Sequence, residues 1–258
     1  MYLRRARRGA ALTLCLALLV GPWAVGCSAV ANPVHSSAVA DGPSQSASAS
    51  AAPRATPPVV MFLGDSYTVG EVGVVPEETY ASATARLLGW QVIVGGRGGT
   101  GFVKTTNGED DFLGMFELQL GWRPAPDMLI VSGGHNDRRL TGPEVAAAAR
   151  TLLDRATQRW PGTHLVLMGP MWGSGSPTPQ VLGVRDALKQ LAGRLGVPFV
   201  DPIAEQWITG GPMGGGNAAR YIKRDGTHPT PAGHRYMATR LAADIERLGL
   251  ARPVRDAP

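Results

Sequence analysis

Five short apolar runs, separated by longer amphipathic stretches, constrain the fold more than any other feature of this sequence. The first run, Val59–Leu63, is apolar at every position, which is typical of a strand that is buried on both faces of a sheet. The five runs are Val59–Leu63, Trp90–Val94, Met128–Ser132, His164–Met168 and Val197–Asp201.

The stretches between these runs carry apolar residues at three- and four-residue spacing, which predicts amphipathic helices. The four stretches are Glu77–Leu88, Pro143–Trp160, Gln180–Leu195 and Ala232–Leu248. Alternating strands and helices indicate right-handed βαβ units. We therefore expect an α/β fold, a three-layer α/β/α sandwich with a five-stranded parallel sheet.

The N-terminal segment has the pattern of an export signal. Four arginines within the first eight residues precede the apolar run Ala10–Val20, whose eleven residues are fewer than the roughly 20 that span a bilayer. Small residues then lead to Cys27, and this arrangement resembles a bacterial lipobox. The resemblance implies that residues 1–26 are a signal peptide and that Cys27 carries a lipid. An ordinary secretory signal and an uncleaved anchor are the alternatives.

The next segment, residues 27–57, is rich in Ala, Ser and Pro and has no hydrophobic period. Such a composition is typical of a disordered tether. We expect one folded domain at 58–250 and a C-terminal tail at 251–258. Both cysteines, Cys15 and Cys27, precede this domain, so it is predicted to hold no disulfide, thiolate metal site or cysteine nucleophile.

The net charge of +5 suggests a nucleic-acid partner at first sight. Four of the 25 basic residues belong to the signal segment, however, which leaves 21 against 20 acidic residues. The remaining chain is therefore close to neutral, and we expect no nucleic-acid partner. The predicted location is the outer face of the bacterial cell membrane, through the lipid on Cys27, or secretion.

Polar or glycine-rich loops follow the predicted strands at the sheet edge where parallel sheets bind ligands. Gly64–Ser66 follows the first strand, Gly95–Gly101 the second and Gly133–Asp137 the third, while Asp225–His228 precedes the last helix. Each loop alone has an ordinary structural explanation, such as a helix N-cap or a turn. The glycine loop formally matches G-x-G-x-x-G, but it follows the second strand and opens no helix. We therefore exclude a dinucleotide site.

Together the four blocks, GDSY, the glycine loop, GHND and DGTH, resemble the SGNH, or GDSL-type, hydrolase family over residues 58–250. The resemblance implies a flavodoxin-like SGNH hydrolase fold and serine esterase chemistry. It implies that Ser66 is the nucleophile, that His228 is its general base and that Asp225 orients His228.

The resemblance also implies an oxyanion hole. Its donors would be the Ser66 N–H, the Gly99 N–H and the Asn136 side chain, with Gly98 as the competitor of Gly99. The chain departs from the family name at Tyr67, where that name has Leu. This position is not catalytic in the family.

Two further residues are candidates for the substrate pocket. His135 fills the variable position of its block and Trp172 lies in a Gly/Ser-rich loop, but a structural role is equally consistent with each. His234 is expected to pack rather than to catalyse. No cofactor and no metal are expected, because no pair of histidines has the spacing of zinc ligands.

These features predict a surface-anchored serine esterase that acts on a small-molecule, glycan or lipid ester. The Gly-rich and polar loops favour a short acyl group or acetyl. An acyltransferase or a polysaccharide O-deacetylase with the same site is the alternative. A non-catalytic envelope-binding lipoprotein is a third hypothesis, and the sequence does not define an oligomeric state.

Overall fold

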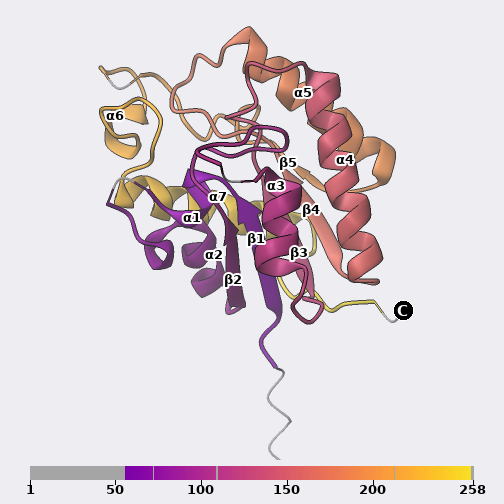
Figure 1. Ribbon diagram of the computed structural model, residues 1–258. Coiled ribbons are helices and arrows are strands. Elements are labelled where there is room, and N and C mark those ends of the chain that lie inside the picture. Colours follow the sequence, from indigo (N-terminus) through magenta and orange to yellow (C-terminus); the bar gives the residue numbers. More distant parts are fainter. Residues whose placement is uncertain (1–55, 72, 109, 212, 257–258) are drawn as a thin grey trace, which may run out of the picture. The chain divides into compact units, whose positions relative to one another are not determined.

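The computed structural model describes residues 56–256 except 72, 109 and 212 (Figure 1). The predicted signal peptide, Cys27 and all but the last two residues of the predicted tether lie outside this range.

A five-stranded parallel sheet forms the centre of the domain, with the strand order β2-β1-β3-β4-β5. The strands are β1 Val59–Gly64, β2 Gln91–Gly96, β3 Met128–Ser132, β4 His164–Met168 and β5 Phe199–Val200. The prediction of five parallel strands is confirmed. The last strand is shorter than predicted, because the Val197 N–H is bonded to the preceding helix and Pro198 has no N–H.

Four long helices cover the sheet, and each overlaps a predicted amphipathic stretch. They are α2 Tyr80–Leu88, α4 Gly142–Arg159, α5 Pro179–Leu195 and α7 Pro231–Arg247. The shorter helices are α1 Ser66–Val69, α3 Phe112–Met115, α6 Ala218–Tyr221, the 3₁₀-helix η1 Pro76–Glu78 and the π-helix η2 Phe116–Leu120. The predicted helix 77–88 is interrupted at Thr79, whose backbone is extended.

Local sequence signals start three of the long helices. The side chains of Thr141, Thr178 and Thr230 each accept a backbone N–H in the first turn of the helix that follows. A proline stands at the first or second position of each of these helices, where its missing N–H costs nothing. These caps explain why the helix starts agree with the predicted stretches to within one residue.

The helices form two layers, one on each face of the sheet (Figure 1). On one face, Val60 and Phe62 of β1 pack with α2 and α7. On the other face, Met61 and Leu63 pack with α3, α4 and α5. Because neighbouring β1 residues point to opposite layers and all four are buried, the strand must be apolar throughout. The α/β/α sandwich is confirmed.

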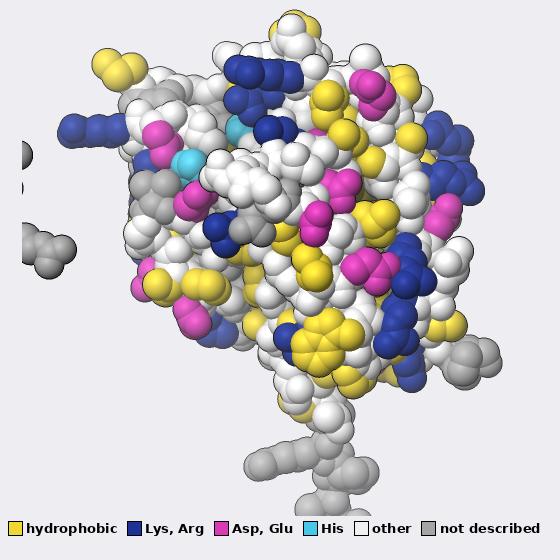
Figure 2. All heavy atoms as spheres, viewed as in Figure 1, with side chains coloured by type: hydrophobic (Ala, Val, Ile, Leu, Met, Phe, Trp, Pro, Cys, Tyr) yellow, Lys and Arg dark blue, Asp and Glu magenta, His cyan; other side chains and the backbone are white. Residues whose placement is uncertain are grey.

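The carboxyl ends of β1, β2 and β3 lie at one level. Gly64 is paired with Gly96 on one side and with Ser132 on the other. A Cβ atom at Gly96 would lie 1.8 Å from the Gly64 carbonyl oxygen, and its φ of +123° also requires glycine. Because the three strands end at one level, the loops that follow them start at a common edge of the sheet. Figure 2 shows acidic and basic side chains interspersed over one face of the domain. Among the described residues, no helix combines the length and the apolar character of a membrane span.

Candidate active site

Ser66 begins α1 directly after β1. The side chain of Asp65 caps this short helix and accepts the Tyr67 N–H at 3.1 Å. A residue at the first position of a helix has no carbonyl partner for its own N–H within the helix. The Ser66 N–H is therefore available at the sheet edge beside its own hydroxyl group.

Ser66, His228 and Asp225 form one hydrogen-bonded chain. Nε2 of His228 lies 3.2 Å from Oγ of Ser66, and Nδ1 lies 2.8 Å from Oδ2 of Asp225. The other Asp225 oxygen accepts the N–H groups of Thr227 and His228, each at 2.9 Å. These bonds hold the imidazole with Nε2 toward the hydroxyl. His228 can therefore take the proton of the Ser66 hydroxyl when that hydroxyl acts as a nucleophile.

The Asp225 carboxylate is suited to orient an imidazole at neutral pH. Partial burial acts to raise its pKa, but the hydrogen bonds from Thr227 and His228 outweigh burial, and the pKa lies below its ordinary value. The group is therefore ionised, and it accepts hydrogen bonds only.

A second carboxylate faces the same imidazole. Oε2 of Glu71, in the loop after α1, lies 3.6 Å from Nε2 of His228, and the Glu71 side chain is half exposed. It also fills the space over Gly98, where a Cβ atom would lie 2.6 Å from Oε2. No sequence motif marks Glu71, so the sequence predicts no role for it.

Of the predicted oxyanion donors, Asn136 contacts Asp65, the residue before Ser66. Nδ2 of Asn136 donates to the Thr100 carbonyl at 2.8 Å and makes a longer contact of 3.4 Å with Asp65. Gly99 has a φ of +80°, in the left-handed region that favours glycine. Within the described chain, neither Gly98 nor Gly99 donates its N–H to another residue, so both remain candidates for this position.

Asp137 holds the glycine loop in place. Its carboxylate is fully buried and accepts the N–H groups of Phe102, Val103 and Lys104 at 2.9–3.1 Å. A Cβ atom at Gly101 would lie 2.3 Å from this carboxylate. The loop after β3 thus fixes the loop after β2. Asp137 is the last residue of the GHND block, but the sequence predicts no function for it.

Asp65 has an unusual ionisation. Burial raises its pKa to about 7, and the nearby Asp137 charge adds to the rise against the lowering effect of the Tyr67 N–H. Both protonation states of Asp65 are therefore populated near neutral pH. Its long contact with the Asn136 amide is strongest when Asp65 is ionised.

Tyr67 connects α1 to the DGTH loop. Its buried hydroxyl donates to the carbonyl of Thr227, between Asp225 and His228. Its ring lies 6.3 Å from the His228 ring, measured between centroids. A leucine could not make this hydrogen bond. Tyr67, where the family name has Leu, therefore makes a contact that positions the DGTH loop. The sequence predicts no role for it.

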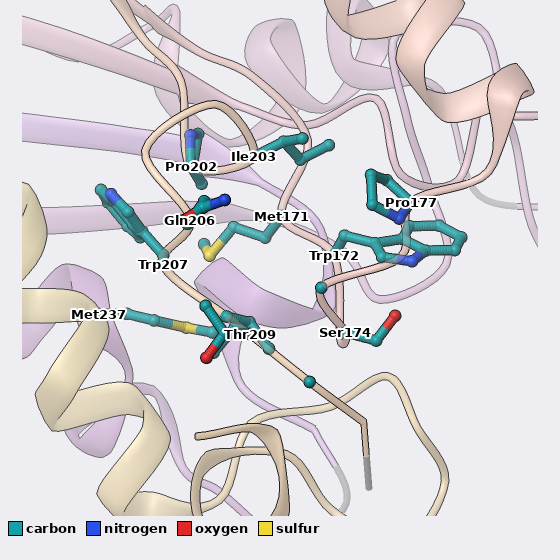
Figure 3. Close-up of a pocket in the computed structure, with 13 residues that line it drawn as sticks. Met171, Trp172, Ser174, Pro177, Pro202, Ile203, Gln206, Trp207, Thr209 and Met237 are labelled. Atoms are coloured by element: carbon teal, nitrogen blue, oxygen red, sulfur yellow. The ribbon is translucent and has the colours of Figure 1, made fainter. Parts of the chain in front are cut away.

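His135 and Trp172, the two predicted pocket residues, lie next to each other. The His135 ring packs 5.9 Å from Tyr67 and 5.2 Å from Trp172. Burial, together with the Arg138 charge, lowers the pKa of His135 to about 4, so it is neutral at pH 7. Trp172 lines a cavity of about 410 Å³, whereas His135 does not (Figure 3).

His234 is buried in α7 and accepts the Tyr80 N–H at 3.1 Å through Nδ1. It therefore packs α7 against α2. In the part of the chain that the structure describes, no group of three or more His, Cys, Asp or Glu side chains is arranged to hold a metal ion.

Comparisons with known proteins agree with this geometry. Residues 62–236 match the GDSL-like lipase/acylhydrolase family. The chain is 30% identical to a GDSL lipase of Mycobacterium tuberculosis over 196 residues, which covers 71% of this chain and 79% of that protein.

Solved structures show the same fold at lower identity. An aryl esterase of Mycobacterium smegmatis is 18% identical, with a TM-score of 0.55 over 74% of this chain and 99% of that one. A family two carbohydrate esterase of Clostridium thermocellum is 20% identical, with a TM-score of 0.57 over 76% of this chain and 66% of that one. A carbohydrate acetylesterase of Sinorhizobium meliloti is 17% identical, with a TM-score of 0.57 over 74% and 99%.

The fold, the order of the four motif loops and the matched range agree with one another. The chain belongs to the GDSL-like lipase/acylhydrolase family and is a carboxylic ester hydrolase.

Proposed function

We propose that the protein is a surface-anchored serine esterase that hydrolyses esters of short acyl groups, with acetyl favoured. The observation that carries this proposal is the hydrogen-bonded chain from the Ser66 hydroxyl through His228 to Asp225. A serine hydroxyl attacks a carbonyl only when a base takes its proton, and His228 lies within reach to do so.

The reaction proceeds in two halves. Oγ of Ser66 attacks the ester carbonyl while Nε2 of His228 takes the hydroxyl proton. The tetrahedral intermediate then collapses, His228 gives that proton to the departing alcohol, and the acyl group stays on Ser66. Water, deprotonated by His228, attacks the acyl-enzyme and releases the acid. Asp225 stabilises the imidazolium in both halves.

The charge on the tetrahedral oxygen needs preorganised donors. In our proposal these are the N–H groups of Ser66 and Gly99 and the amide of Asn136. One Asn136 hydrogen is held by the Thr100 carbonyl at 2.8 Å, which fixes the plane of the amide. The other has only the 3.4 Å contact with Asp65, so little is lost when a substrate oxygen accepts from it instead.

The alternative is O-deacetylation of a polysaccharide, or acyl transfer, by the same site. The carbohydrate esterase and carbohydrate acetylesterase among the structural neighbours favour a sugar ester over other alcohols. Acyl transfer differs only in whether water or a sugar hydroxyl attacks the acyl-enzyme.

An acyl-length series tests the esterase proposal. We expect p-nitrophenyl acetate to give the highest kcat/KM in a series up to palmitate, because the loops at the site are polar and glycine-rich. Ser66→Ala should lower kcat by about 10⁴-fold or more, since the nucleophile is lost. Ser176→Ala, at an exposed serine, is the matched control and should keep full activity. Wild-type turnover equal to that of Ser66→Ala on every ester would refute the proposal.

Tyr67→Phe tests the role of the bond to Thr227. Loss of this buried hydrogen bond should lower the free energy of unfolding by about 1–2 kcal/mol. Because the His228 loop is less firmly placed, kcat for p-nitrophenyl acetate should fall about tenfold or more at unchanged KM. The control is Tyr236→Phe, whose hydroxyl contacts only Arg240 at 3.4 Å. An unchanged kcat in Tyr67→Phe would show that the bond does not position His228.

The lipid anchor has its own test. Mass spectrometry of the protein from membranes of a bacterial host should show a diacylglyceryl adduct on an N-terminal Cys27. A chain that still starts at Met1, or that starts at Ser28, would contradict the anchoring proposal and leave the esterase proposal intact.

A further inference from the structure

A cavity of about 410 Å³ lies between the loop after β4, the loop after β5 and α7, and the proposed reaction does not account for it (Figure 3). Its volume lies in the range of small-molecule sites, about 300–1,000 Å³. Met171, Trp207 and Met237 are buried residues that form its apolar part. A cavity of this size, with an aromatic wall and an open side, can hold one small ring.

The polar groups around the cavity carry no charge. Its lining contains no Asp, Glu, Lys, Arg or His among the described residues. Its side-chain polar groups are the hydroxyls of Ser174 and Thr209, the carboxamide of Gln206 and the indole N–H groups of Trp172 and Trp207, which donate to Ser176 and Glu205. Phosphate and carboxylate ligands are normally bound through cationic groups, so this lining suits a neutral ligand.

The partly exposed Trp172 ring supplies a flat apolar surface at the side of the cavity (Figure 3). Its indole N–H donates to the Ser176 carbonyl at 3.2 Å, which fixes the orientation of the ring. A pyranose presents C–H groups on one face and hydroxyls around its edge. An aromatic ring beside neutral amide and hydroxyl groups matches both properties.

Gln206 has a backbone conformation that is rare for a residue with a side chain. Its φ is +50°, in the left-handed region that a residue with a side chain rarely occupies. The turn is fixed by hydrogen bonds from the Gln206 N–H to Ile203 and from the Trp207 N–H to Pro202. Figure 3 shows Gln206 between Trp207 and Trp172, with its carboxamide at the cavity. Backbone strain of this kind is common at ligand sites.

The cavity lies beside the Ser66 site but is separate from it. Gly173 packs on the DGTH loop so closely that a Cβ atom there would lie 2.1 Å from the Gly226 carbonyl oxygen. Trp172 contacts His135, which contacts Tyr67 next to His228. None of the residues proposed to act on the ester lines the cavity. A group bound there is therefore several bonds away from the reacting carbonyl.

We propose that this cavity binds a neutral pyranose ring in the alcohol part of the ester substrate. The inference rests on the proposed function: no residue that acts on the ester carbonyl lines the cavity, so we assign its occupant to the alcohol part of the substrate and not to the acyl group. The half-exposed Glu71 carboxylate near His228 also disfavours an acidic sugar at the same edge. The substrate class is an O-acetylated neutral saccharide.

The kinetic test compares sugar esters with an ester that has no sugar. The substrates are mono-O-acetylated methyl glucoside, xyloside and mannoside, and p-nitrophenyl acetate. Trp172→Ala and Gln206→Ala should raise KM at least about tenfold for one or more of the sugar esters. In both variants the ratio of kcat/KM for that sugar ester to kcat/KM for p-nitrophenyl acetate should fall, and circular dichroism with a thermal unfolding curve shows that they fold. The conservative Trp172→Phe should retain most of the affinity, and Trp122→Ala, at an exposed tryptophan elsewhere, is the matched control.

Three outcomes would overturn the inference. The first is a KM for every sugar ester that is unchanged in both variants. The second is an equal loss on p-nitrophenyl acetate, which would assign Trp172 to the Ser66 site itself. The third is a larger effect on p-nitrophenyl octanoate than on any sugar ester, which would make the cavity an acyl pocket. No turnover of any ester by the wild type would instead contradict the proposed function.

A binding measurement is independent of catalysis. Isothermal titration of the Ser66→Ala protein with the same three acetylated glycosides should detect binding of at least one, and Trp172→Ala in that background should abolish it. Undiminished binding in the double variant would place the sugar elsewhere and refute the cavity as its site.

Discussion

The site depends on the contact between β1 and β2 at their carboxyl ends. Gly64 and Gly96 are paired there, and the Gly64 carbonyl occupies the space that a Cβ atom at Gly96 would need. A larger residue would push the strands apart or stop the ladder early. Because both strands end level with β3, the loops that hold Ser66, Gly99 and Asn136 start from one line. The backbone of the α/β/α sandwich therefore aligns the three loops, independently of the side chains that react.

Buried polar bonds between loops then determine the position of each group. Asp137 ties the loop after β2 to the loop after β3, and Tyr67 ties α1 to the DGTH loop. Asp225 fixes its own turn through two N–H groups while it orients His228. Asp137 and Tyr67 are buried and are paired with backbone groups of the neighbouring loop, so losing either side chain would leave backbone groups without a partner. The loops are therefore held by the protein itself, and substrate contacts are not needed to order them.

The sequence predicts most of the fold and the residues that meet at the edge, and it predicts few of the contacts that hold them. Apolar runs such as Val59–Leu63 are unambiguous because a strand buried on both faces cannot alternate. Helices such as α3 are too short to show a full amphipathic period, so the sequence does not predict them. The function of Tyr67 depends on a carbonyl 160 positions away, and no local pattern encodes that distance. The cavity next to Trp172 is formed by three segments far apart in the chain, so the sequence could indicate only one of its walls.

The central claim is that Ser66 is a nucleophile activated by His228, and covalent trapping tests it most directly. The protein is treated with a p-nitrophenyl alkylphosphonate, and the adduct is located by peptide mass spectrometry. The account predicts one phosphonyl group per chain, on Ser66, and at least a hundredfold slower labelling in His228→Ala. Labelling of another residue with Ser66 unmodified, or labelling of Ser66 at the same rate without His228, would contradict it.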